Sequence, residues 1–191
     1  MKKQIGSVNC LYHLPTVLVG AVVNEKPNFI TIAHLGIMND RPPHHISLSM
    51  GKVHYTNAGI KENRTFSVNI PSENLMTQTD YCGIVTGKTT DKTTLFQIFY
   101  GELKTAPMIK ECPVNMECKL AQIVDFPTHD IFIGEIVQTY AEEAVLNEER
   151  PDLFKVKPLL FDMNSKRYWS IGYPLGNCWK VGMEIKKKMQ E

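Results

Sequence analysis

The 191-residue sequence has no apolar run approaching the roughly 20 residues needed to span a bilayer. Lys2 and Lys3 are not followed by the apolar stretch of a secretory signal. The sequence also lacks an excess of charge of either sign, because 21 Lys and Arg residues are balanced by 20 Asp and Glu residues and the net charge is +1. Binding to a phosphate backbone needs a basic face. We therefore expect neither a membrane nor a nucleic acid as a partner.

Cysteine is scarce, and its five copies form an odd set without short spacings. This usage favours reduced thiols and a cytoplasmic location over a disulfide framework. Cys112 and Cys118 are too far apart for the usual zinc spacing. His44 and His45 are adjacent and would point to opposite faces of a strand, so they cannot hold one ion together. We expect no metal site.

Three catalytic motifs are absent or incomplete. The sequence contains neither Gly-x-Ser-x-Gly nor Gly-x-Gly-x-x-Gly, so a nicotinamide would have to bind without a Rossmann domain. The segment Gly83–Thr89 looks like a phosphate loop, but three residues separate Gly83 from Gly87 where a Walker loop has four. It also follows a helical pattern instead of a strand. An NTPase is therefore not predicted.

The residues that are present predict one mainly-β domain over residues 1–191. Apolar residues make up 43% and charged residues 21%, as in ordinary globular proteins with a packed core. Runs of β-branched and alternating residues between turn signals predict strands. Ile46 and Leu48 should face one side of such a strand, and Ser47 and Ser49 the other. The predicted strands are Thr16–Val23, Asn28–Leu35, His45–Met50, Thr65–Ile70, Met116–Phe126 and His129–Tyr140.

Helical patterns are few. Tyr55–Asn63 is predicted as a helix with Thr56 as its N-cap, and Glu73–Gly83 as a second one capped by Ser72. The apolar face of the second helix would be Leu75, Tyr81 and Cys82. Glu142–Leu153 would be a short helix or a surface excursion. Because strands outnumber helices and follow one another in hairpin-like runs, we predict an antiparallel barrel with small helices, not a doubly wound sheet.

Two segments offer groups suited to an anionic or planar ligand. Thr86 has a hydroxyl, Gly87 lets backbone N–H groups approach, and Lys88 and Lys92 bring charge. An exposed polar loop would have the same composition. In Pro27–His34, Asn28 and Thr31 could pair with the edge of a heterocycle, or merely shape a turn and fill a strand.

Two further features allow more than one interpretation. Tyr55 and Thr56 open a helix, whose free N–H groups attract phosphate, although Thr56 could simply cap the helix. The aromatic residues near the C-terminus are predicted to lie in the core or in an interface, with one or two covering a bound ring. They are Phe154, Phe161, Tyr168, Trp169, Tyr173 and Trp179.

Taken in order, these pieces resemble the flavin reductase-like family, whose fold is the FMN-binding split barrel, and within it the flavoredoxin branch. The similarity extends over nearly the whole chain. It is carried by Pro15–Gly20, Pro27–Ala33, Arg41–Pro43, Ser47–Ser49, Tyr55-Thr56, Phe66–Pro71, Tyr81–Lys88, Asp91-Lys92, Glu111–Pro113, Glu117-Cys118, His129–Gly134, Pro158–Phe161 and Tyr168–Gly172.

The resemblance implies a split β-barrel with Greek-key, antiparallel strands, and a homodimer with one FMN per subunit near the interface. Asn28 and Thr31 would contact the isoalloxazine ring, helped by the backbone of Ile32 and Ala33. His34 would lie beside them, at a position where flavoredoxins often have tryptophan. The other implied FMN-binding residues are Ser47, Ser49 and Thr56 for the ribityl chain and phosphate, Thr86, Gly87, Lys88 and Lys92 for the phosphate region and ring oxygens, and His129 and Phe161 for the far side of the flavin.

The resemblance also implies a redox function. We predict that bound FMN accepts electrons or hydride and passes them to an acceptor protein or flavin. One alternative is an NAD(P)H:flavin oxidoreductase that supplies reduced flavin to a partner, and another is a non-catalytic flavin-binding module. Thr86 and Lys88 stand where serine and arginine are commoner, which keeps the hydroxyl and the charge but loses a bidentate fork.

Overall fold

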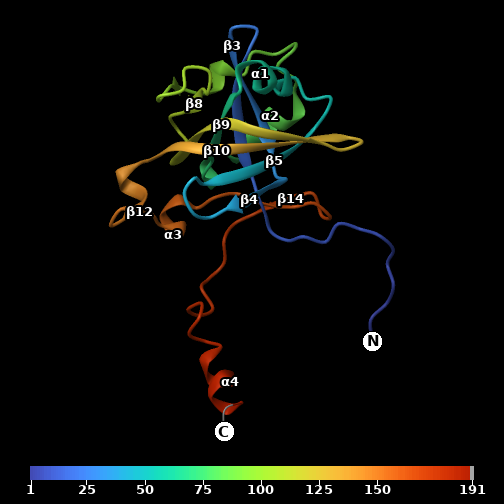
Figure 1. The fold of residues 1–191 in the computed structure, drawn as a ribbon, viewed down its shortest axis with the longest axis vertical. Coiled ribbons are helices and arrows are strands. Elements are labelled where there is room, and N and C mark those ends of the chain that lie inside the picture. Colours follow the sequence, from blue (N-terminus) through green and yellow to red (C-terminus); the bar gives the residue numbers. More distant parts are fainter. Residues whose placement is uncertain (190–191) are drawn as a thin grey trace.

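The largest element of the protein is a seven-stranded antiparallel sheet, described by a computed structural model that covers residues 1–189 (Figure 1). Its strand order is β3-β2-β6-β9-β10-β5-β4. The strands are β2 (Val17–Val23), β3 (Lys26–Ile32), β4 (Leu35–Asn39), β5 (His45–Gly51), β6 (Thr65–Ile70), β9 (Val114–Asp125) and β10 (His129–Ala141). The predicted mainly-β split barrel is confirmed.

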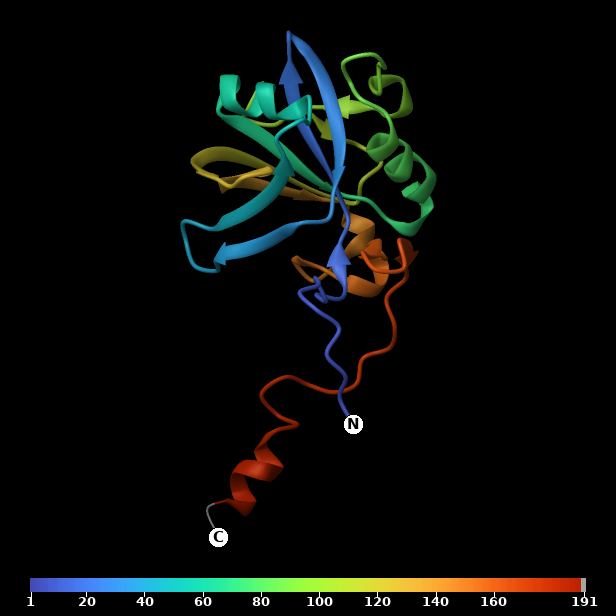
Figure 2. The ribbon, with the colours of Figure 1, turned by 90° about the vertical axis from the view of Figure 1, so that its right-hand side faces the viewer.

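The sheet curls because its two edge strands, β3 and β4, follow one another in the chain. Only Ala33 and His34 separate them, so the opposite edges of the sheet must come close together. The edges do not pair as strands, and the barrel therefore stays split at this seam. Figure 2 shows the curled sheet from the side.

Alternating side chains fill the barrel. In β5, Ile46, Leu48 and Met50 are buried while the intervening serines are partly exposed, as the sequence predicts. They meet inward-facing residues of β2, β6, β9 and β10, among them Phe66 and Phe132, in one core cluster. A second cluster lies outside the barrel, where Leu18 and Phe29 pack under the helical region.

Two helices cover the barrel next to the seam. Helix α1 (Thr56–Asn63) packs on β2, and α2 (Met76–Ile84) packs on β3 after the short 3₁₀ turn η1 (Glu73–Leu75). The predicted N-cap at Thr56 is wrong, because α1 begins at Thr56 itself. Ser72 does stand at the N-cap position of η1, although its side chain makes no capping hydrogen bond. Tyr81 is exposed and is not part of the apolar face that Leu75 and Cys82 form.

The remaining elements are short. The segment Glu142–Leu153, predicted to be either a short helix or a surface excursion, is a surface excursion. Strand β1 (Leu14–Pro15) pairs with β13 (Leu160–Asp162), which pairs with β14 (Arg167–Trp169) beside the seam. The other elements are η2 (Thr93–Leu95), β7 (Ile98–Phe99), β8 (Met108–Ile109), η3 (Glu143–Val145), β11 (Leu146–Asn147), β12 (Arg150–Pro151), α3 (Leu153–Val156) and α4 (Met183–Lys188).

Candidate functional site

A cleft of about 600 Å³ opens at the seam of the barrel, and we call it the main cleft. Its floor comes from the end of β3 and the seam residues, and its walls from β5, α2, β10 and the β13–β14 hairpin. The predicted residues that line it are Thr31, Ile32, Ala33, His34, Ser49, His129 and Phe161. These residues are far apart in the sequence, and the closure of the barrel brings them together.

A smaller polar pocket of about 240 Å³ adjoins the main cleft, and we call it the inner pocket. The two share Thr31, His54 and the end of α2 as lining. The predicted residues in the inner pocket are Asn28, Thr56, Thr86, Gly87 and Lys92. A polar compartment that continues into a larger one suits an elongated ligand with one polar end and one flat end.

Lys92 supplies a buried positive charge to the inner pocket. Its side chain is only 3% exposed, and its Nζ donates hydrogen bonds to the carbonyl oxygens of Phe29 and Cys82, each at 2.8 Å. An ammonium group has three donors, so one remains. Desolvation lowers the pKa of Lys92 below its ordinary value. Within residues 1–189 no carboxylate forms a salt bridge with it, so an anionic ligand would relieve the cost of burying this charge.

Asn28 and Gly87 are in close contact in the inner pocket. The Asn28 amide is buried and donates a 2.7 Å hydrogen bond to the hydroxyl of Thr56, which joins β3 to the start of α1. Gly87 lies so close that a Cβ there would come within 2.6 Å of the Asn28 Cγ. Asn28 thus does more than shape the turn after Pro27, and only glycine leaves room for it.

Thr31 connects the main cleft to α2. Its hydroxyl donates to the carbonyl oxygen of Thr79, one turn before the end of that helix. Tyr168 reaches the same helix from β14, where its hydroxyl donates to Asp80 at 2.9 Å. Burial raises the pKa of Tyr168, and the Asp80 carboxylate adds to this effect. The tyrosine therefore stays a proton donor over the physiological range.

Two polar atoms of the lining have no protein partner among the described residues. They are Thr16 Oγ1 on the main cleft and His54 Nδ1, which borders both compartments. Buried polar atoms are rarely left unpaired, because each costs about 1–3 kcal/mol. A polar ligand would satisfy them.

Three histidines face the main cleft. The rings of His34 and His129 are 6.2 Å apart, and His54 lies on the same cleft. Desolvation lowers the pKa of both His34 and His54, and a charge on His129 lowers it further. The rings of His34 and His54 are therefore expected to be mostly neutral at neutral pH.

This histidine cluster predicts a pH dependence of stability. A folded protein that disfavours protonated His34 loses stability as pH falls below about 6.5, where the unfolded chain takes up protons. We expect the melting temperature of the ligand-free protein to fall between about pH 7.5 and 5.5, and the fall to be smaller in His34→Gln. Differential scanning fluorimetry across this range measures both, and parallel curves for the two proteins would contradict the assignment.

Two of the predicted site residues, Ser47 and Lys88, line neither the main cleft nor the inner pocket. Ser47 lies on an outer extension of the cleft, of about 360 Å³, that shares His34 and Ser49 with the main cleft. Lys88 is exposed and lines none of these compartments, although its backbone N–H donates to the Thr86 hydroxyl at 3.3 Å. Sequence reasoning missed Thr16 and His54 as site residues. Neither lies in a pattern of its own, and only barrel closure brings them to the cleft.

Cys82 lies in the core, as expected, whereas several C-terminal aromatic residues do not. Cys82 is buried beside Lys92, and burial raises its pKa to about 11, so it is an inert thiol near the site. Trp169, Tyr173 and Trp179 are exposed and so do not lie in the core, and their place in an interface stays a prediction. Phe161 does line the cleft, with its ring 6.0 Å from that of Tyr168.

A membrane-spanning helix or a cluster of metal ligands would point to a different function. Among residues 1–189, no helix is long and apolar enough to cross a membrane. The same residues contain no group of three or more His, Cys, Asp and Glu side chains placed to hold a metal ion.

Residues 9–170, which include the split barrel and both compartments beside its seam, match the family model of the flavin reductase like domain. The chain belongs to this family. Flavoredoxin from Methanosarcina acetivorans is 42% identical and superimposes with a TM-score of 0.94 over 97% of this chain and 99% of its own. Flavoredoxin of Desulfovibrio vulgaris (Miyazaki F) is 33% identical, with a TM-score of 0.88 over 95% and 100%.

One further relative is similar in sequence. An uncharacterized protein from Archaeoglobus fulgidus is 30% identical over 151 residues, which cover 78% of this chain and 84% of its own. The predicted family and its flavoredoxin branch are thus confirmed, and with them a flavin-related redox role.

Proposed function

We propose that this protein binds FMN and carries electrons from a donor to an acceptor protein or flavin. The observation that supports FMN best is Lys92, a buried ammonium that faces a polar pocket and has no acidic partner among residues 1–189. When bound, FMN supplies a ring system that accepts and releases electrons at N5, and the protein supplies position and electrostatics. The reduced state of the buried and exposed cysteines suits a cytoplasmic carrier.

The two compartments divide the proposed binding work. In the inner pocket, Thr56, Thr86 and Lys92 would hold the phosphate-bearing chain, because hydroxyl and ammonium donors suit phosphate oxygens. The main cleft would take the ring, with the backbone of Ile32 and Ala33 along one edge and Phe161 across from it. Lys92 also brings positive charge close to the ring, which favours the reduced state.

Replacing Lys92 tests the proposal. Lys92→Met should weaken FMN binding by about 10–100-fold, because a charge-assisted hydrogen bond to a charged group contributes about 1.5–3 kcal/mol. The exposed Lys88 is a matched control, and Lys88→Met should bind FMN within about threefold of the wild type. Fluorescence titration of the apoprotein with FMN measures both. A colourless wild-type protein that takes up no FMN would overturn the proposal.

A second candidate is an NAD(P)H:flavin oxidoreductase. The outer extension beyond His34 favours it, because it leaves room for a second molecule next to a ring in the main cleft. Steady-state oxidation of NAD(P)H with free flavin separates the two functions. Rapid turnover with weakly held flavin supports the reductase, whereas tightly held FMN with slow NAD(P)H oxidation supports the electron carrier. If no donor reduced the bound FMN, the remaining interpretation would be a non-catalytic flavin-binding module.

A further inference from the structure

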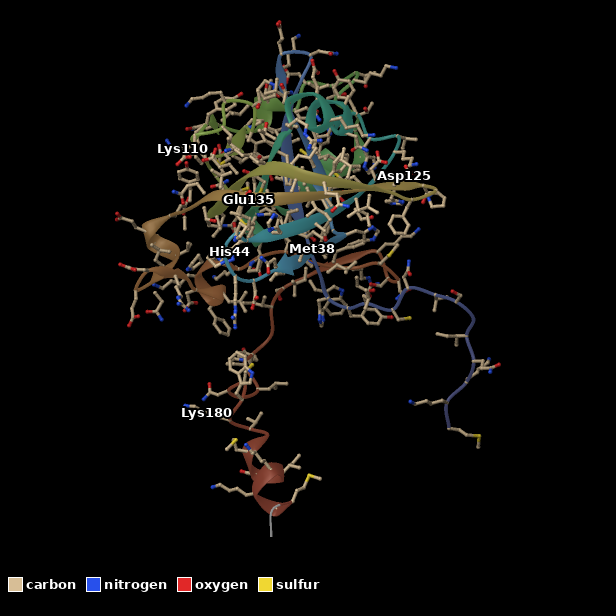
Figure 3. All side chains as sticks on the ribbon, viewed as in Figure 1. Met38, His44, Lys110, Asp125, Glu135 and Lys180 are labelled. Atoms are coloured by element: carbon tan, nitrogen blue, oxygen red, sulfur yellow. The ribbon has the colours of Figure 1, made fainter. Side chains whose placement is uncertain are left out.

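A separate pocket of about 510 Å³ lies at the other end of the β9–β10 hairpin from the main cleft, and we call it the far pocket. No described residue lines both the far pocket and either of the two compartments at the seam. A strand rises about 3.3 Å per residue, so Tyr140 of the far pocket and His129 of the main cleft are roughly 30 Å apart along β10. Figure 3 shows Lys110 of the far pocket and Asp125 near the hairpin tip at opposite sides of the body.

Two aromatic rings form one wall of the far pocket. Phe99 from β7 and Tyr140 from β10 meet edge to face, with their ring centroids 5.9 Å apart. The Tyr140 hydroxyl donates a 2.7 Å hydrogen bond to the buried Glu117 carboxylate. Glu117 also accepts from the backbone N–H groups of Glu102 and Leu103, so it is itself held in place. The Tyr140 ring is therefore fixed, and its hydroxyl is already occupied.

A buried amide forms the polar part of the far pocket. Asn115 is 4% exposed and is the partner of Tyr140 in the register of β9 and β10, so both side chains lie on one face of the sheet. The Asn115 Nδ2 donates to the Asn69 Oδ1 and to the Ile109 carbonyl oxygen, each at 2.8 Å. Neither Asn69 nor Ile109 lines the pocket. Both donors of the Asn115 amide are thus turned away from it.

Backbone groups fix the orientation of this amide. Ile109 accepts from Asn115 through its carbonyl oxygen, and its N–H donates to the Asn69 Oδ1 at 3.0 Å. Asn69 donates its own Nδ2 to the Leu18 carbonyl oxygen. If Asn115 were flipped, its oxygen would lie against two acceptors. The Asn115 Oδ1 therefore faces the far pocket.

This oxygen has no protein donor. Within residues 1–189 the Asn115 Oδ1 accepts no hydrogen bond, and it is not among the unpartnered atoms that are shut off from solvent. Acceptors on buried side chains are rarely left without a donor. Cys112 lies beside it on the lining, and burial raises the pKa of this thiol, so it stays protonated and adds apolar surface. Water would satisfy the amide oxygen but would leave the aromatic wall wet.

We propose that the far pocket binds a small aromatic molecule with one N–H or O–H donor, such as an indole or a phenol. The ring would pack on Phe99 and Tyr140, and its donor would reach the Asn115 Oδ1. The volume of the pocket falls in the range of small-molecule sites. The inference does not depend on FMN. Exposed polar residues stand at the mouth of the pocket, and they are Gln97, Lys110 and Glu142.

Two ring molecules of the same shape test this recognition without any mutation. Indole has an N–H donor, and benzofuran has an oxygen in its place. Each is titrated into the whole 191-residue chain and followed by two-dimensional proton–nitrogen NMR. Indole should move the side-chain amide signals of Asn115 and the backbone signals of Ile98 and Lys110. It should bind about 5–10-fold more tightly than benzofuran, because only indole can donate to the amide oxygen.

Variants of the pocket separate the wall from the amide. Phe99→Ala removes part of the aromatic wall and should weaken indole binding by about tenfold. Phe126→Ala is the matched control, because it removes a 48% exposed ring at the hairpin tip and should leave the affinity unchanged. In Asn115→Ala, indole and benzofuran should bind equally.

Three results would count against the proposal. Far-pocket signals that do not move at the solubility limit of indole would exclude the site. Equal affinities of indole and benzofuran for the wild type would show that the Asn115 Oδ1 does not recognise the ligand. Shifts confined to main-cleft residues such as Ala33 and His129 would place the probe in the proposed flavin site instead.

Discussion

Gly87→Ala is expected to weaken FMN binding by about 10–100-fold while leaving the fold intact. The added methyl group would take the space of the Asn28 side chain, whose Cγ lies 2.6 Å from the ideal Cβ position. Asn28 would have to rotate, and its buried 2.7 Å hydrogen bond to Thr56 would break. Two residues of the inner pocket would thus be displaced together. Titration with FMN and the circular dichroism spectrum measure affinity and fold.

Gly83→Ala is the matched control for this prediction. Gly83 borders the same pocket, but a Cβ there would only touch the Thr31 Cβ at 3.4 Å, an ordinary contact. We expect this variant to keep its FMN affinity. If Gly83→Ala and Gly87→Ala weakened binding equally, the close fit of Asn28 against Gly87 would not be the cause.

The second large effect concerns stability. In α1, Gly59 lies against β2 so closely that a Cβ would come within 2.8 Å of Val23 Cγ2 and 2.9 Å of the Val22 carbonyl carbon. The obstacle is partly backbone of a central strand, which cannot move aside. Overpacking of a core typically costs 1–3 kcal/mol and occasionally more. We expect Gly59→Ala to lower the free energy of unfolding by about 3 kcal/mol, or the melting temperature by about 6–12 °C.

Urea denaturation of the apoprotein measures this loss. Gly182→Ala adds the same methyl group where nothing lies within 4 Å, and it should leave the midpoint unchanged. An unchanged midpoint for Gly59→Ala would show that α1 can move away from β2. In that case the site residues at the start of α1 would also be less firmly positioned than the structure indicates.

Local patterns were sufficient to predict most of the strands. Thr65–Ile70 is β6 to the residue, and the hairpin of β9 and β10 agrees within two residues at each end. Alternation is a good predictor here because one face of each strand is buried in the barrel. Apolar and polar residues therefore alternate along the sequence with a period of two. Only the long predicted strand at Asn28–Leu35 was divided, at the seam between β3 and β4.

Tertiary partners account for what the sequence could not predict. Thr56 has the composition of a cap, yet its hydroxyl is taken by Asn28, which is 28 positions away. Lys88 and Lys92 look alike in one loop, but only Lys92 turns inward to meet two carbonyl groups. Trp179 was expected in the core or in an interface because of its large ring, yet it is exposed, because the composition of a segment does not tell whether that segment packs on the body of the same chain.

The order of strands also bears on when a flavin can be taken up. Strand β6 pairs with β2 and β9, each about 50 positions away, and β5 pairs with β10 at a still larger separation. Such distant pairings form slowly. Because β10 and β14 supply walls of the main cleft, a chain still emerging from the ribosome has no complete site until residues near 168 are free to fold. The flavin would therefore bind only after synthesis of the site is complete. The yellow colour of a bound flavin would then indicate that the chain has finished folding.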